Sequence, residues 1–206
     1  MHPAPRPRFG IRTAPSQVDY RDVLRVWQEA DAVPEIEHAA HGLPFHDTAH
    51  AVESLAEACT VIRRLWTETE PFDFHGARHH LTGAFGSPKP VQRPHPPILI
   101  GGRSSATLRV VAEHADLWNI PGGGDIDDLT RRSALLDRYC AEAGRDPASV
   151  VRSIHLPVSY DRPGVTRDAI GEAVDAGFRH IVLGLPGPYP DGVARWAADE
   201  IVRPSV

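Results

Sequence analysis

The chain has 206 residues, of which 41% are hydrophobic and 24% charged, and its formal net charge is −5. This length is enough for one well-buried core, so we expect residues 1–206 to form a single domain, although single-domain barrels often reach about 250 residues. The acidic balance gives no reason to expect a nucleic-acid partner.

Cysteine usage and hydropathy favour a cytoplasmic protein. Cys59 and Cys140 lie far apart, outside any CxxC spacing and within helical patterns, so we expect buried thiols in a reducing compartment. The N-terminal letters MHPAPRPRFG contain no apolar run that could serve as a signal peptide. No stretch reaches the roughly 20 apolar residues that cross a bilayer, so we expect no membrane partner.

The first half of the chain predicts a short strand, two helices and a hairpin. Residues 9–12 (FGIR) are typical of a strand, and residues 18–31 place apolar side chains on one helical face. A second amphipathic helix is expected over residues 48–66, with Asp47 or Thr48 as its cap. The letters FDFHGARHHL, within the irregular stretch 70–96, predict a small hairpin.

From residue 97 onward, strands and helices alternate. Gly177 occupies the position of a helix C-cap glycine. Strands alternating with helices of this length predict an α/β fold, in which helices cover a parallel sheet. The expected strands are 97–100, 116–120, 150–158 and 179–184, and the expected helices are 104–114, 126–143, 166–176 and about 191–201.

A glycine pair follows the first of these strands. In parallel α/β folds, ligands bind at the carboxyl ends of strands. Gly101 and Gly102 occupy such a place, where a backbone without Cβ atoms can approach a flat ring or a phosphate. The next strand leads into a second glycine-rich loop, residues 119–124 (NIPGGG). Two adjacent loops predict a cofactor site; the alternative is a tight βα turn without a ligand, since neither GxGxxG nor a Walker loop is present.

Further side chains are candidate site residues. Arg12, Thr13 and Gln17 follow the first strand and are candidates for substrate contacts, or else turn and cap residues. Trp118 would pack in the core or stack on a ring. Residues 186–190 (PGPYP) follow the last strand, where many barrels bind phosphate.

The histidines raise the possibility of a metal site. His46 and His50 have the spacing of the HExxH zinc motif, with Asp47 in place of Glu. However, Pro44 and the helix cap place His46 outside the helix, and no third ligand is evident. We therefore expect no metal site and keep a metal-dependent hydrolase only as an alternative. His155, within a strand, is interpreted as a core or rim histidine.

Five stretches, spread over residues 9–190, carry a family resemblance: FGIRTAPSQVDYRDVLRVWQEADAVPEIEHA, EACTVIRRLWTE, SPKPVQRPHPPILIGG, AEHADLWNIPGG and GFRHIVLGLPGPYP. Together they resemble the luciferase-like monooxygenases, most closely the branch that uses coenzyme F420 rather than FMN. The resemblance implies an eight-stranded (β/α) barrel that holds the cofactor ring at the carboxyl ends of its strands. It also implies cofactor contacts from Gly101, Gly102, Asn119, Ile120, Pro121, Gly122 and Gly123.

The chain departs from the family at the letters EIEHA, which run directly into AHGLPF as if an internal stretch had been removed. What remains resembles strands one and five to eight, a barrel truncated to about five strand–helix units. The family's histidine after the second strand has no match, and its role is not transferred to His38 or His41, so no catalytic residue is assigned. An open barrel would expose sheet edges and part of an apolar face. Strands one and five could pair to close a smaller, cramped barrel, or two chains could complete each other as a homodimer.

The resemblance implies hydride transfer with F420, or FMN-linked monooxygenation, on a small organic substrate. In both reactions the cofactor performs the chemistry while the protein positions it. The alternative is a non-catalytic remnant or association module of the same fold.

Overall fold

The computed structural model describes residues 8–12, 47–120 and 125–205. Five of the described strands form a parallel sheet in the order β1-β7-β6-β5-β4, which confirms the predicted α/β fold. The helix predicted over residues 18–31 lies outside the described residues. The strands are β1 (Arg8–Arg12), β4 (Leu99–Gly101), β5 (Leu117–Ile120), β6 (Val151–Pro157) and β7 (His180–Gly184).

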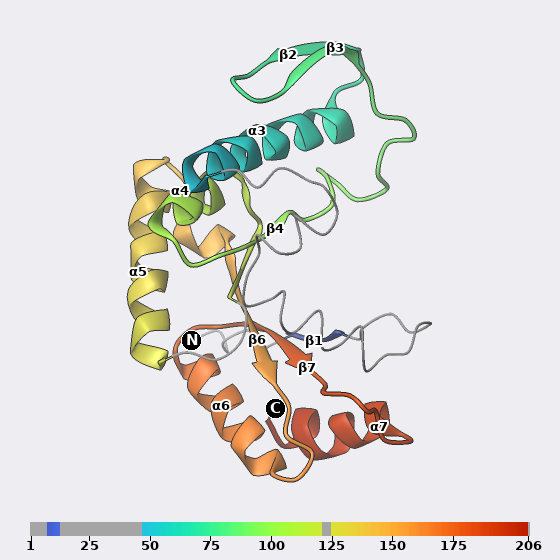
Figure 1. Cartoon of the computed structure of the whole chain (residues 1–206), viewed down its shortest axis with the longest axis vertical. Coiled ribbons are helices and arrows are strands. Elements are labelled where there is room, and N and C mark those ends of the chain that lie inside the picture. The colour runs from blue at the N-terminus through green and yellow to red at the C-terminus, as the bar shows by residue number, and fades with distance from the viewer. Residues whose placement is uncertain (1–7, 13–46, 121–124, 206) are drawn as a thin grey trace, which may run out of the picture.

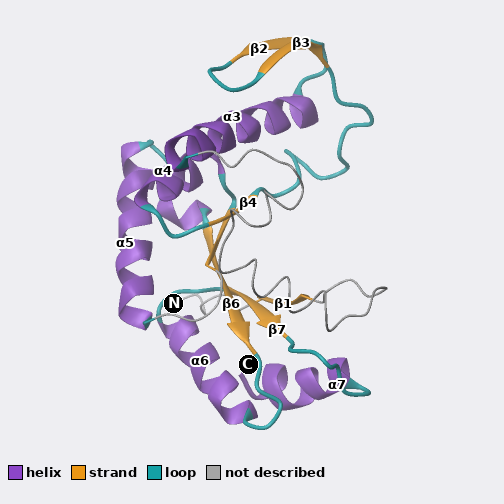
Figure 2. Ribbon diagram, viewed as in Figure 1, coloured by secondary structure: helices purple, strands orange, loops and turns teal. Residues whose placement is uncertain are grey.

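The helices lie along one side of this sheet, as Figure 1 shows for α4, α5 and α6, with α3 and α7 at the two ends. The colours of Figure 2 separate the strands from this outer arc of helices. Among the described residues, no helix has the length and apolar character needed to cross a bilayer. The helices are α3 (Thr48–Thr67), α4 (Ser105–His114), α5 (Ile126–Glu142), α6 (Pro163–Asp175) and α7 (Val193–Ala197), the last continuing as a π-helical turn (Ala198–Val202) and a 3-10 turn (Arg203–Ser205).

The strand order matches part of a (β/α) barrel. β1 pairs in parallel with β7, the last strand of the chain, as strands one and eight do in a closed barrel. In the described part of the chain, β1 and β4 each pair with only one neighbour, so the sheet is open between them. The arrangement is the one expected for the first strand and the last four strands of the family barrel.

Local signals set the helix boundaries. Asp47, rather than Thr48, caps α3, because its carboxylate accepts a 2.8 Å hydrogen bond from the His50 amide. α6 begins at Pro163, three residues before the predicted start, since proline suits the first positions of a helix. Gly177 follows α6 with φ +94° and donates its amide to Val174 O at 3.0 Å, which confirms its predicted place at the helix end.

Alternate strand residues point toward the helices and form the core. Trp118, Ile120, Ile154, Ile181 and Leu183 are at most 2% exposed. They pack in one continuous cluster with apolar side chains of α4, α5 and α6. Both cysteines are buried, as predicted, and burial raises the pKa of each thiol, which makes both less reactive; they are Cys59 and Cys140.

The predicted hairpin is also present, formed by β2 (Phe72–His75) and β3 (His80–Ala84). It lies across α3 from the sheet (Figure 1). The Glu57 carboxylate of α3 accepts backbone hydrogen bonds from Ala77 at 2.6 Å, Arg78 at 3.0 Å and His79 at 2.7 Å. A Cβ at Gly76 would lie 2.4 Å from the same carboxylate. One acidic side chain therefore fastens the hairpin turn to α3.

This contact predicts a pH dependence of the hairpin. Desolvation raises the pKa of Glu57, but hydrogen bonds from the His79, Arg78 and Ala77 amides outweigh it, so the pKa falls below the ordinary 4.5. Because the pKa is lower in the folded state, the stabilisation is complete above about pH 4.5 and is lost as the pH falls through the folded-state pKa. In NMR spectra, the amide signals of residues 77–79 should therefore move together only at acidic pH. In Glu57→Gln this titration should be absent; its persistence would contradict the assignment to Glu57.

Candidate functional site

The two predicted loops begin at the same edge of the sheet. Gly101 ends β4 in register with Asn119 of β5, and the Gly102 amide donates to Asn119 O at 3.3 Å. Since β4 and β5 are parallel, the turn after Gly101 and the loop after Ile120 leave the same edge. The structure therefore brings Gly101, Gly102, Asn119 and Ile120 together, whereas Pro121, Gly122 and Gly123 lie outside the described residues.

Side chains of β5 and α5 hold the turn after β4 by hydrogen bonds. Trp118 donates its indole N–H to Gly102 O at 2.9 Å, and Arg132 of α5 donates to Arg103 O. Both carbonyl oxygens therefore accept hydrogen bonds from side chains of the protein. Arg132 also donates to Asp128 at 2.7 Å, a bond that lowers the pKa of the carboxyl. Trp118 is 0% exposed, so the idea that it stacks on a ligand ring is wrong.

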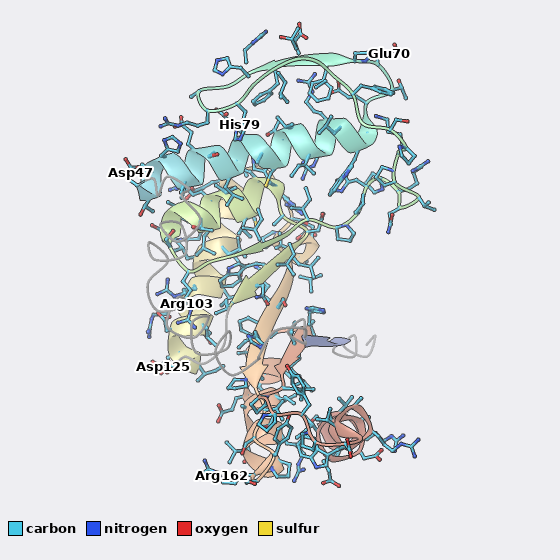
Figure 3. All side chains as sticks on the ribbon, turned by 45° about the vertical axis from the view of Figure 1, so that its right-hand side comes forward. Asp47, Glu70, His79, Arg103, Asp125 and Arg162 are labelled. Carbon is cyan, nitrogen blue, oxygen red and sulfur yellow. The ribbon has the colours of Figure 1, made fainter. Side chains whose placement is uncertain are left out.

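Residues that precede α4, α5 and α6 mark the same edge of the sheet. Figure 3 shows Arg103, Asp125 and Arg162 succeeding one another down one margin of the molecule. Arg103 follows β4, while Asp125 and Arg162 immediately precede α5 and α6. This margin is therefore the one where a parallel α/β fold binds ligands.

The sheet face opposite the helices, which we call the inner face, carries a row of small and polar residues. Gly101, Asn119, Ser153 and His180 are in register across four adjacent strands. Ser153 Oγ donates to Asn119 Oδ1 at 2.8 Å and lies 2.7 Å from His180 Nδ1. Ser153 is 0% exposed. A hydrogen-bonded chain therefore crosses three strands and ends beside the glycine turn.

His155 also lies on the inner face, opposite to its neighbours Ile154 and Leu156. It is half-buried, and its ring crosses β7 at Gly184, where a Cβ would lie 2.3 Å from His155 Nε2. Arg12, a predicted substrate residue, ends β1 in register with Gly184. The other two predicted substrate residues, Thr13 and Gln17, lie outside the described residues.

Ser153 and His180 are not among the site residues predicted from the sequence. A signal was present, because Ser153 and His155 alternate with the apolar Ile154 and Leu156, a pattern that indicates one polar face on a strand. The pairing of Ser153 with His180, however, depends on the register between β6 and β7, which no local pattern specifies.

The loop after the last strand is anchored by an aromatic pair. Tyr160 donates its hydroxyl to Pro186 O at 2.8 Å and meets Trp196 edge-on, with ring centroids 5.2 Å apart. Burial raises the pKa of Tyr160, and Tyr189 adds to the effect, so the phenol remains a donor. The phosphate role considered for residues 186–190 stays a prediction.

The suggested histidine metal motif is only partly within the described residues, because His46 is outside them. His50 lies in the first turn of α3. In residues 8–12, 47–120 and 125–205, no group of three His, Cys, Asp or Glu side chains could hold a metal ion.

A match to a family model shows to which protein family the chain is related. Residues 30–200 match the model of the luciferase-like monooxygenases. The chain belongs to this family. Among curated proteins, this luciferase-like chain is 32% identical over 151 residues to an uncharacterised protein of Mycobacterium tuberculosis, covering 73% of this chain and 48% of that one. It is 26% identical over 167 residues to the FMNH2-dependent dimethylsulfone monooxygenase of Pseudomonas putida, covering 78% and 45%. It thus spans about half the length of these relatives.

Solved structures show the same fold. An F420-dependent secondary alcohol dehydrogenase in complex with an F420–acetone adduct gives a TM-score of 0.66 at 16% identity, covering 77% of this chain and 63% of that one. The coenzyme F420-dependent tetrahydromethanopterin reductase of Methanopyrus kandleri gives 0.63 at 14%, covering 75% and 64%. The EDTA monooxygenase of a Chelativorans species gives 0.62 at 14%, covering 80% and 61%. The luciferase-like fold therefore has both F420-dependent enzymes and monooxygenases among its neighbours.

Proposed function

We propose that this luciferase-like chain is a cytoplasmic, single-domain oxidoreductase that binds coenzyme F420, with FMN as the alternative cofactor. It acts on a small organic substrate by hydride transfer or monooxygenation. The observation that carries this proposal is that Gly101 and Asn119 lie in register at the edge of the sheet where the two predicted loops begin. Relatives named for F420 and for FMNH2 support a deazaflavin or flavin at this edge.

The residues at this edge fit a flat ring that carries carbonyl groups. The nearest atom to a Cβ built at Gly101 is Asn119 O, at 3.7 Å, so bare backbone borders open space there. A ring can lie against such backbone, and the Asn119 amide can donate to a ring carbonyl. The start of α4, which Ser104 caps, suits a phosphate group.

In this proposal Gly101, Gly102, Asn119 and Ile120 hold the cofactor, and Pro121, Gly122 and Gly123 complete the loop around it. Arg12, Thr13 and Gln17 face the substrate. The bound cofactor supplies the hydride or oxygen chemistry, while the chain binds it, orients it and excludes water.

The proposal is tested by titrating the full chain with oxidised and reduced F420 and FMN, followed by their fluorescence. We expect saturable binding of one cofactor at one site per chain, with F420 the tighter. Turnover of the bound cofactor with a panel of small alcohols and sulfur compounds then separates hydride transfer from monooxygenation. Absence of binding of either cofactor would contradict the proposal.

A second candidate is a non-catalytic remnant or association module of the same fold. It is favoured by the open sheet, because in the described part of the chain β1 and β4 each pair with only one neighbour. We propose in either case that two chains associate across the open edges of β1 and β4. Light scattering should show a dimer, and a stable monomer would count against this association. A dimer that binds neither cofactor would support the association module.

A further inference from the structure

The hydrogen-bonded chain on the inner face has a defined direction. Ser153 has a single hydroxyl proton, which it donates to Asn119 Oδ1 at 2.8 Å. At 2.7 Å, His180 Nδ1 must then supply the proton of the second bond and donate to Ser153 Oγ. Because the carboxamide oxygen of Asn119 faces Ser153, its NH2 group is turned away from Ser153.

We propose that Ser153 and His180 are positioning residues that fix the Asn119 carboxamide, so that its NH2 group rather than its oxygen faces a ligand on the inner face. The identity of the ligand group rests on the proposed cofactor function. The group that contacts the Asn119 NH2 is then a hydrogen-bond acceptor, such as a ring carbonyl oxygen. Without the chain, the amide could turn over and present its oxygen, which would repel the same acceptor.

Orientation is a better account of these residues than stability alone. Replacing all the polar side chains of a hydrogen-bonded group by apolar ones of similar shape is nearly neutral for a fold, so stability alone does not require polar residues at Asn119, Ser153 and His180. The backbone carbonyl of Asn119 also accepts a hydrogen bond from the Gly102 amide. Asn119 therefore holds the glycine turn through its backbone, while Ser153 orients its side chain.

The first test uses the fact that Asn119 is the only asparagine in the chain. Asparagine-selective ¹⁵N labelling of the whole protein therefore gives one side-chain NH2 pair in an NMR spectrum. In the wild type we expect two sharp, well-separated signals. In Ser153→Ala, both signals should move and draw closer together, because the carboxamide loses the hydrogen bond to Oδ1 that fixes its orientation.

Two substitutions of the histidine provide matched controls. In His180→Asn, the new amide nitrogen takes the place of Nδ1 and can still donate to Ser153; in His180→Gln, the nitrogen takes the place of Nε2 and cannot. We expect the Asn119 signals to stay near their wild-type positions in H180N and to move in H180Q. H180N introduces a second asparagine and therefore a second pair of NH2 signals, which is recognised because the wild-type spectrum lacks it. Unchanged Asn119 signals in both S153A and H180Q would overturn the proposal.

The ligand side is tested by the dissociation constants of F420 and FMN. S153A and H180Q should weaken binding about five- to tenfold, and H180N should restore it, in line with one oriented hydrogen bond. If the wild type binds neither cofactor, the proposed function fails, and the NMR experiment alone decides the roles of Ser153 and His180. If the wild type binds and all variants bind equally well, the assignment of an acceptor at Asn119 is wrong.

Discussion

Replacing Gly102 by alanine is expected to destabilise the chain by about 1–3 kcal/mol, the usual cost of forcing a side chain into a strained backbone conformation. Gly102 has φ +146°, and a Cβ there would lie 2.7 Å from Thr107 Cγ2. Relief of this contact would displace the carbonyl that Trp118 holds and shift the whole turn. Cofactor binding should therefore be lost together with stability, as measured by urea unfolding and by F420 or FMN titration.

Gly101→Ala is the matched control, one residue away. A Cβ at Gly101 meets Asn119 O at 3.7 Å, an ordinary contact, so stability should stay within about 0.5 kcal/mol of the wild type. The new methyl group would nevertheless occupy the space in which we place the ring, and binding should weaken. Wild-type stability in G102A would contradict the strained turn. Undiminished binding in G101A would show that the ring does not lie on Gly101.

Trp118→Ala should be the most damaging core substitution, with a loss of about 3–5 kcal/mol. The indole is 0% exposed and packs near Phe178, with ring centroids 6.3 Å apart. Since a natural domain has only about 5–15 kcal/mol of stability in total, the variant should be largely unfolded on mild heating. Circular dichroism during urea and thermal unfolding measures the change.

Trp118→Phe separates packing from hydrogen bonding. It keeps an aromatic ring in the core but removes the donor to Gly102 O, so we expect a smaller loss of about 1–3 kcal/mol and a weakened cofactor site. Equal losses in the alanine and phenylalanine variants would show that packing of the indole contributes little. A loss below about 1 kcal/mol in Trp118→Ala would contradict its central place in the core.

Much of the fold could be predicted because its signals are local. Apolar spacing located α3, short apolar runs between helical patterns located β4 to β7, and residue type indicated the hairpin, a cap at Asp47 or Thr48, and the helix end at Gly177. The glycine turn could also be placed, because a strand followed by a helix fixes the edge at which the turn lies. The boundaries differ in detail: Gly101 belongs to β4 itself.

The remaining features depend on contacts between distant segments. Strand 117–120 alternates the half-buried Leu117 and Asn119 with the buried Trp118 and Ile120. Because each pair contains an apolar residue, the letters LWNI give no local indication of which pair faces the helices. The sequence therefore allows either packing or stacking for Trp118. Similarly, the row that joins Asn119, Ser153 and His180 exists only once three strands have taken their register.

The pairing of β1 with β7 has a consequence for how the chain reaches its native state. β4 to β7 join neighbours along the sequence, whereas β1 must find a partner nearly the whole chain away. Contacts of such long range form slowly because of their loop-closure entropy. During synthesis, β1 is made long before β7, so it waits unpaired until its partner has been made. In that interval, the hydrogen-bonding groups of β1 can pair with a strand of another nascent chain, which is a route to misassembly.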